Sequence, residues 1–281
     1  MDDFTMLPEG CISEIVSFTS PADASALSVI SKRFKSATES DTVWKKFLPS
    51  DIDEIVSKSS APFDLPPTKK ELYMFLSHSH IFLDGGKLGL FLDKRTGKKC
   101  FRVAASELVF THRNVTNRMY TEPELLCSRH SDVAVIKSHD REYDIYGRMS
   151  SEKLSEETRY SSYLVFKLSA PSAEHVYITL SFWGVCRFVD NEDKDVAEMR
   201  SRFYNFGFPV VRDDGWLEVE IGTFFNAGGN RGDVESCLFN VVTGYGRFLT
   251  VRGLEIRPEI IFGGMSDWGF SKEFLEVKAD F

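Results

Sequence analysis

Residues 4–49 decide the fold of the N-terminal part, and they read FTMLPEGCISEIVSFTSPADASALSVISKRFKSATESDTVWKKFLP. Their apolar residues recur three or four positions apart in two sets, which are Ile12, Ile15 and Val16, and then Leu27, Ile30 and Phe34. On an α-helix this spacing places side chains on one face. The stretch therefore predicts short amphipathic helices.

Local signals predict where these helices begin. Pro8 opens the first helix, where the N–H that proline lacks would be unpaired in any case. Ser20 and Ser40 precede the next two predicted starts, since a serine hydroxyl there can accept a hydrogen bond from a free amide. In the last helix Trp44 and Leu48 are predicted one turn apart.

This stretch resembles an F-box, the adaptor-binding module of SCF-type ubiquitin ligases. The likeness rests on Leu7-Pro8 followed by Ile12 and Ile15, on Val29 with Phe34 five positions later, and on Trp44-x-x-Phe47-Leu48. A segment this short buries its apolar surface poorly, so an exposed binding face is expected.

The resemblance implies a non-catalytic subunit that binds a Skp-type adaptor and, through it, a cullin. The residues expected to line or support the adaptor-binding face are Leu7, Pro8, Ile12, Ile15, Val29, Phe34 and Trp44. The alternative is a helical cap on the downstream domain, with apolar stripes that are only core.

Composition excludes several classes of function. The chain has 281 residues and a formal net charge of −8, which argues against a broad nucleic-acid-binding surface. It has no apolar run long enough for a membrane span and no secretion signal at its start, so we expect a protein of the cytoplasm and/or nucleus. Its five scattered cysteines lack a C-x-x-C pair and predict reduced thiols.

The periodicity predicts an α+β chain in four parts. Residues 1–50 form the F-box helical module, and residues 51–81 form a Ser- and Pro-rich linker with a connecting helix that begins at a capping box. Residues 82–258 are predicted as an antiparallel β-sandwich of jelly-roll, lectin-like type. Residues 259–281 are predicted as a C-terminal tail packed on the sandwich.

The strands of the sandwich are expected at 88–92, 99–103, 143–148, 162–168, 176–183, 216–224, 234–242 and 248–256. The clearest alternation lies in residues 217–221, where Leu217, Val219 and Ile221 should face inward while Glu218 and Glu220 face water. A sheet with one wet face is typically antiparallel.

Four motifs resemble the phloem-lectin family, phloem protein two, which is related to the tobacco agglutinin Nictaba, in its plant F-box-linked branch. They read GKKCF at 97–101, TRYSSYLVFK at 158–167, DDGWLEVEIG at 213–222 and VRGLEIRP at 251–258. The resemblance covers about residues 70–258. It implies a β-sandwich and, in some members, binding of N-acetylglucosamine-containing or N-linked glycans.

One segment departs from the family pattern. The family's sugar-stacking tryptophans have no counterpart in residues 109–120, VFTHRNVTNRMY. His112 and Tyr120 can replace their aromatic faces only in part. Arg113 and Arg118 can pair with acidic side chains of a protein, or are simply solvated loop charges. These four residues are the predicted target- or glycan-binding site.

No pattern of enzyme chemistry is found. The chain has neither a G-x-S-x-G elbow nor a P-loop, and no cofactor is expected. His78 and His80 lack further ligands at useful spacing, so no metal site is predicted. Two functions remain, a substrate receptor for ubiquitin ligation and a nucleocytoplasmic carbohydrate-binding lectin.

Overall fold

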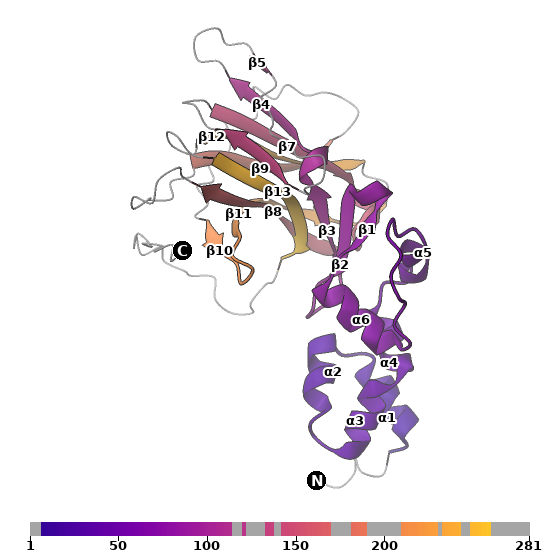
Figure 1. Cartoon of the computed structure of the whole chain (residues 1–281). Coiled ribbons are helices and arrows are strands. Elements are labelled where there is room, and N and C mark those ends of the chain that lie inside the picture. The colour runs from indigo at the N-terminus through magenta and orange to yellow at the C-terminus, as the bar shows by residue number, and fades with distance from the viewer. Residues whose placement is uncertain are drawn as a thin grey trace. The chain divides into compact units, whose positions relative to one another are not determined.

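The computed structural model describes residues 7–113, 120–121, 133–137, 142–169, 181–189, 209–229, 232–242 and 248–259. The chain divides into two compact units, Met1–Arg102 and Val103–Phe281. Helices dominate the first unit and antiparallel sheets the second (Figure 1), which confirms the α+β class. None of the helices in these ranges combines the length and apolar character needed to cross a bilayer.

The helices of the first unit begin at the predicted signals. They are α1 (Glu9–Val16), α2 (Pro21–Leu27), α3 (Lys32–Glu39), α4 (Asp41–Phe47), α5 (Ile52–Ser57) and α6 (Lys69–His78). The Ser20 hydroxyl accepts from the amide of Asp23, and the Ser40 hydroxyl from that of Thr42. At α6 both hydrogen bonds of the predicted capping box are present.

The prediction that Leu27, Ile30 and Phe34 share one helix face is wrong. α2 ends at Leu27, and Ser31 is extended, with φ −158° and ψ 166°. Its hydroxyl accepts from the Phe34 amide at 3.3 Å and starts α3 anew. A strong N-cap residue thus interrupts the helical periodicity.

The core of the first unit is built around Trp44, which is only 1% exposed. Its indole Nε1 donates to the Thr38 carbonyl at 2.6 Å, and its ring centroid lies 5.1 Å from that of Tyr73 on α6. The Phe47 ring approaches edge-on at 5.6 Å. Trp44 therefore joins the F-box helices to α6.

The segment predicted as a linker is folded into the first unit. The Ser60 amide donates to the Phe82 carbonyl at 2.7 Å, and the Phe63 ring stacks on Phe75 at 5.3 Å between centroids. β1 (Ile81–Leu83) then pairs antiparallel with β2 (Leu88–Leu92). The division between the compact units falls within β3 (Lys99–Ala104), and not within the predicted linker at 51–81.

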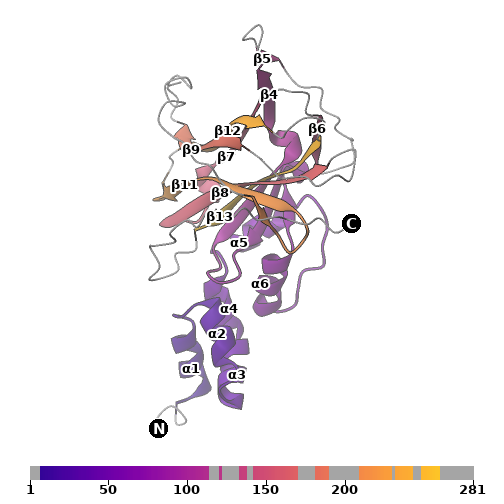
Figure 2. The same ribbon diagram turned by 90° about the vertical axis from the view of Figure 1, so that its left-hand side faces the viewer.

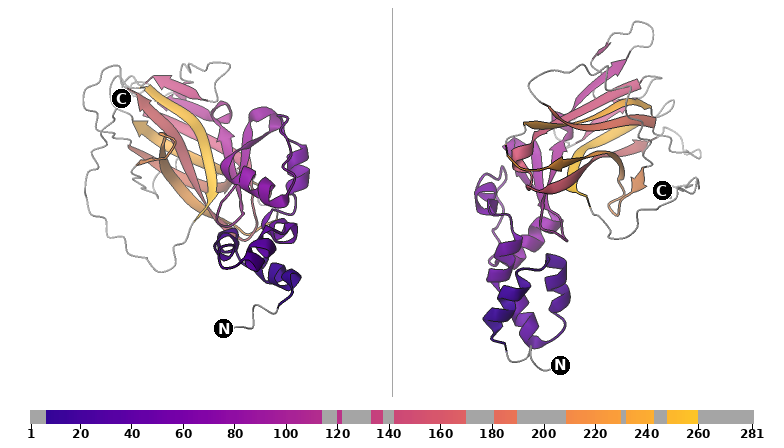
Figure 3. Two further views of the ribbon diagram at one scale, coloured as in Figure 1. Left: turned by 60° about the horizontal axis from the view of Figure 1, so that its bottom comes forward. Right: turned by 180° about the vertical axis from the view of Figure 1, so that it is seen from behind.

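The second unit is an antiparallel sandwich, as predicted (Figures 2 and 3). In one sheet its strands follow the order β13 (Phe248–Pro258), β8 (Thr158–Ser169), β11 (Leu217–Asn226) and β10 (Val210–Val211), with β6 (Ala134–Lys137) also paired to β13. The other sheet has the order β5 (Tyr120–Thr121), β4 (Val109–Arg113), β7 (Glu142–Ser150), β12 (Asp233–Val242) and β9 (Ser181–Val189).

Glycine allows the two sheets to approach closely at one place. A Cβ added to Gly184 of β9 would clash with the Ile221 carbonyl oxygen of β11. Between the sheets the Ser236 hydroxyl donates to that of Ser162 at 2.8 Å. Backbone meets backbone at Gly184, so this position has no room for a side chain.

The strand predictions mostly hold, with several omissions. Of the strand predicted at 176–183, residues 181–183 lie in β9, whereas residues 176–180 and the predicted tail beyond Glu259 lie outside the described ranges. The prediction missed β1, β4, β5, β6 and β10. These strands have two to five residues each, too few for a period-two pattern to stand out.

Candidate functional site

Large apolar side chains are exposed on the F-box helices and their turns. Their exposed fractions are 50% for Ile15, 76% for Phe18, 84% for Val29 and 62% for Ile30. Ile15 lies on α1, Phe18 follows that helix, and the other two lie in the turn between α2 and α3. Large apolar side chains exposed on a small helical module are candidates for contact with a partner protein. We call these four residues the exposed apolar set.

The structure separates the predicted adaptor-binding residues into surface and core. Ile15, Val29 and Pro8 are exposed, and Leu7 and Phe34 are half-buried. Ile12 and Trp44 are 2% and 1% exposed, so they can support a binding face from behind but cannot line it. The sequence prediction did not include Phe18, which follows α1. It placed Ile30 on a helix face with Leu27 and Phe34, whereas Ile30 lies in the turn between α2 and α3.

Polar contacts fix the helices that carry the exposed apolar set. Lys46 of α4 pairs with Glu14 of α1 at 2.7 Å, and its ammonium lies 4.1 Å from the centroid of the Phe18 ring. The buried Ser13 hydroxyl donates to the Ala37 carbonyl of α3 at 3.1 Å. Exposed ion pairs contribute little stability, and their value here is to orient α1 and the Phe18 ring.

Three of the predicted target- or glycan-binding residues, His112, Arg113 and Tyr120, lie on β4 and β5, at one edge of the second sheet. In the ladder between β4 and β5, His112 is opposite Thr121 and Arg113 is opposite Tyr120. Three of the four residues are thus on adjacent strands, whereas Arg118 falls in 114–119, outside the described residues. Their role in binding stays a prediction.

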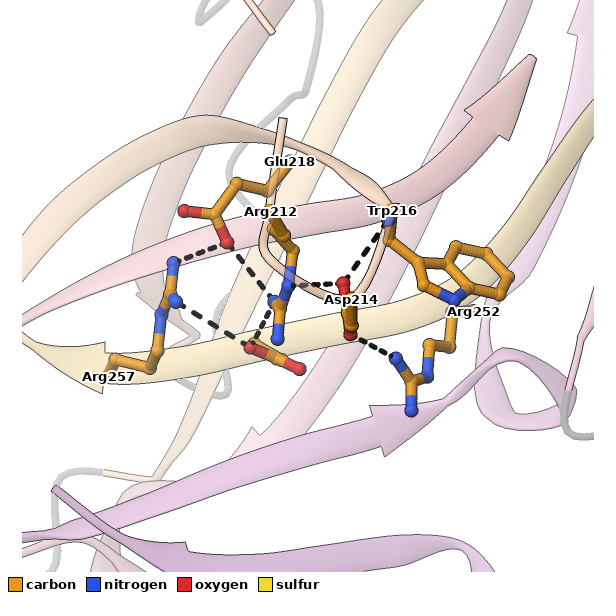
Figure 4. A network of polar contacts seen from close by, with 7 residues as sticks. Arg212, Asp214, Trp216, Glu218, Arg252 and Arg257 are labelled. Carbon is orange, nitrogen blue, oxygen red and sulfur yellow. Dashed lines mark hydrogen bonds and ion pairs between the residues drawn. The ribbon is translucent and has the colours of Figure 1, made fainter. Parts of the chain in front are cut away.

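A polar network forms where two of the family-like motifs, 213–222 and 251–258, meet (Figure 4). Its centre is the hairpin of residues 212–216 between β10 and β11. The Arg212 amide donates to the Trp216 carbonyl at 2.8 Å, and Gly215 turns the chain at φ 74°. The hairpin presents the side chains of Arg212, Asp214 and Trp216 to the outer face of its sheet.

Arg212 links the hairpin to β11 and β13. Its Nη1 lies 3.1 Å from Glu218 Oε2 and 2.8 Å from Glu255 Oε2. Arg257 reaches Glu218 from the other side, at 2.9 Å. The prediction that Glu218 faces water is therefore wrong, because the hairpin and these guanidiniums cover that part of the sheet, whereas Glu220 is exposed as predicted.

Asp214 joins the tip of the hairpin to β13. Its carboxylate accepts from the Trp216 amide at 3.2 Å and from Arg252 Nη1 at 2.8 Å. Partial burial alone would raise the pKa of Asp214, but the Trp216 amide and the Arg212 and Arg252 guanidiniums outweigh it, so this pKa lies below its ordinary value. Asp214 is therefore charged at neutral pH.

Trp216 is half-buried and lies between two cations. The Lys167 ammonium is 4.7 Å from the centroid of its ring, and the Arg252 guanidinium carbon is 5.3 Å from it. Lys167, Trp216 and Arg252 come from three motifs far apart in sequence. The sequence showed each motif alone, and only the order of β11, β8 and β13 brings them together.

A second ionic cluster lies on the other sheet. Glu235 of β12 is 3% exposed and accepts from Arg148 of β7 and Arg187 of β9, each at 2.6 Å. Burial alone would raise the pKa of Glu235, but the hydrogen bonds from Arg187 and Arg148 outweigh it and place the pKa below its ordinary value.

This cluster predicts a pH-dependent part of the stability. Because the folded pKa of Glu235 is depressed, its carboxylate stabilises the fold above the unfolded pKa of about 4.3, and this contribution is lost as pH falls through the folded pKa. The gap in unfolding free energy between wild type and Glu235→Gln should be constant above about pH 5 and shrink below about pH 4. Urea unfolding at several pH values measures it. A gap that does not narrow in acid contradicts the role of Glu235, and Glu152→Gln, at an exposed site, is the control.

Within the described ranges, no three His, Cys, Asp or Glu side chains gather in a way that could hold a metal ion. His78 is exposed, and its Nδ1 lies 2.7 Å from the Met74 carbonyl oxygen. The His80 ring packs at 4.5 Å from that of Phe91. Each of these histidines thus has a local neighbour within the first unit.

Comparison with known families matches both parts of the chain. Residues 4–46 match the F-box domain, and residues 98–258 match Phloem protein 2. The chain is therefore an F-box protein that belongs to the phloem protein 2 family.

Proteins from Arabidopsis thaliana are similar to this chain over most of its length. The F-box protein SKIP3 is 35% identical over 264 residues, which cover 90% of this chain and 87% of that protein. The F-box protein PP2-B7 is 34% identical over 274 residues, covering 90% and 83%. The F-box protein PP2-B10 is 34% identical over 268 residues, covering 91% and 94%.

Proposed function

We propose that this protein is the substrate-recognition subunit of an SCF-type ubiquitin ligase. Its F-box binds a Skp-type adaptor and, through it, a cullin, while the β-sandwich binds the protein to be ubiquitinated. The protein itself carries out no chemistry in this role, and it acts in the cytoplasm or nucleus. The observation that carries the proposal is the exposed apolar set on α1 and in the adjoining turns, in a module whose other large apolar residues are mostly buried.

Burial of the exposed apolar set supplies the driving force for adaptor binding. Removing a side chain such as Phe18 or Val29 from water is worth about 1.5 to 3 kcal/mol. The core of the first unit does not include these side chains, because it is made of other residues that are fully buried, among them Val16, Val43 and Leu72. A partner that covers them explains their exposure.

The test is co-expression of the full chain with a Skp-type adaptor. The double variant Ile15→Glu/Val29→Glu should reduce adaptor capture by about a thousandfold, because each change places a charge in an apolar contact worth about 2 kcal/mol or more. Both sites are exposed, so thermal unfolding of the free chain should be unchanged. Leu7→Ala/Pro8→Ala should act in the same direction.

The matched control is Val109→Glu/Val210→Glu in the second unit. These valines are 57% and 61% exposed, so the charge change is the same as in the test variant and the apolar loss differs by one methylene group. The control should capture the adaptor as well as wild type does. Equal capture by the test variant and wild type would contradict the proposal.

For the sandwich we propose recognition of protein, with only weak binding of free chito-oligosaccharide. The support is the absence of tryptophan from residues 109–120, since a sugar site needs a flat aromatic platform. Isothermal titration of the adaptor-bound protein with chitotriose should give no Kd tighter than about 1 mM. A micromolar Kd would favour the lectin function instead.

A further inference from the structure

We propose that Trp216, Lys167 and Arg252 form a docking surface for an acidic peptide segment of the target protein. This inference rests on the proposed function, because it names where a target docks and with what chemistry. We call these three residues the Trp216 surface.

Strand register assembles the Trp216 surface. Leu217 of β11 is opposite Phe166 of β8, so Trp216 and Lys167 are cross-strand neighbours at the end of this ladder. On the other side of β8, Thr250 of β13 is opposite Lys167 and is followed two residues later by Arg252. One aromatic ring and two cations therefore share one end of the outer sheet face.

The ring is held in place before any ligand arrives. Asp214 binds both the Trp216 amide and the Arg252 guanidinium, and Arg212 ties the same hairpin to the buried Glu255. A pre-organised surface loses little conformational entropy on binding. The indole is half-buried, so it combines a fixed position with an accessible part.

The arginines of the network are paired with carboxylates, whereas the ammonium group of Lys167 is available to a ligand. Arg212 and Arg257 are bound to Glu218 and Glu255, and Arg252 is bound to Asp214. Lys167 is exposed and makes no ion pair with any described residue, and its ammonium is positioned by the Trp216 ring. Its N–H donors suit a carboxylate, whose side-chain methylenes can pack on the indole.

The overall charge decides between anionic partners. The chain carries a net charge of −8, which repels an extended polyanion such as nucleic acid or an anionic membrane. A short acidic peptide needs only the local positive charge beside Trp216. Complementary charge of this kind gives specificity and favours encounter.

The experiment uses the full chain bound to its adaptor, and a fluorescein-labelled oligoglutamate peptide as the probe. Fluorescence polarisation should show that oligoglutamate binds at least about tenfold tighter than oligoglutamine of equal length. Lys167→Glu should weaken this binding about tenfold, whereas Lys94→Glu, the same charge change at an exposed site in the first unit, should alter it less than about twofold.

Other outcomes would overturn the docking surface. These are equal binding of the two peptides, equal effects of the two lysine variants, or lysine-dependent binding to phosphatidylserine vesicles without binding to oligoglutamate. Trp216→Ala should weaken oligoglutamate binding, but this change can also disturb the hairpin. Trp216→Phe, which keeps an aromatic ring, is therefore measured beside it and should weaken binding less than Trp216→Ala does. Adaptor capture is measured on the same samples: if capture is normal but oligoglutamate does not bind, only the docking surface fails, and if wild type captures no adaptor, the proposed function fails.

Discussion

Replacing Trp44 by alanine is expected to lower the free energy of unfolding of the first unit by about 3 to 5 kcal/mol. The ring is 1% exposed and contacts Tyr73 and Phe47, so its removal leaves a cavity. The Thr38 carbonyl also loses its hydrogen bond from the indole. Urea unfolding followed by circular dichroism measures the loss.

Adaptor capture separates this effect from a surface effect. Trp44→Ala should weaken capture because the F-box helices lose their support, and a stabilising osmolyte should restore capture in part. Val29→Ala, at a site 84% exposed, should change stability by less than about 0.5 kcal/mol. If the Trp44→Ala protein is as stable as wild type, the packing of Trp44 does not stabilise the core of this unit.

Replacing Gly184 by valine is expected to prevent the two sheets from packing. Any Cβ at this position meets the Ile221 carbonyl oxygen, which is backbone and cannot turn aside. Overpacking costs typically about 1 to 3 kcal/mol when side chains can adjust, and more is expected where a strand must move. The variant should be largely insoluble, or should melt far below wild type in a thermal scan.

Gly10→Ala is the control for Gly184→Val. A Cβ on Gly10 of α1 meets no atom within 4 Å, and alanine favours a helix. Stability should therefore rise by up to about 1 kcal/mol. A soluble Gly184→Val protein with wild-type melting would mean that the sheets are farther apart at this point.

The sequence predicts what depends on local chemistry. The helix starts at Ser20, at Ser40 and at the capping box of α6, whose first residue is Thr68, are predictable because a cap needs only a hydroxyl and a nearby amide. The alternation of residues 217–221 placed Val219 and Ile221 in the core correctly.

Features that depend on contacts between distant parts of the chain could not be predicted from the sequence. Glu218 has the alternation of a water-facing residue, and only the folded hairpin shows that Arg212 and Arg257 cover it. In the same way, the helical spacing that includes Trp44 cannot tell an adaptor contact from a core residue. Phe18 follows the end of α1, where no helical spacing marks it, and Ile30 was assigned to a helix face that is interrupted between α2 and α3.

The folded segment between α5 and α6 has a consequence for how the protein can be cut. Its Ser- and Pro-rich composition is typical of a flexible linker, at which the F-box would be separated from the rest of the chain. In the structure, however, Ser60 and Phe63 hold this backbone against β1 and α6. Proteases act on backbone that can leave its surroundings, so the segment should resist limited proteolysis. A fragment that ends before this segment would also lack Tyr73. The Trp44 ring would then lose a packing partner and become more exposed to solvent.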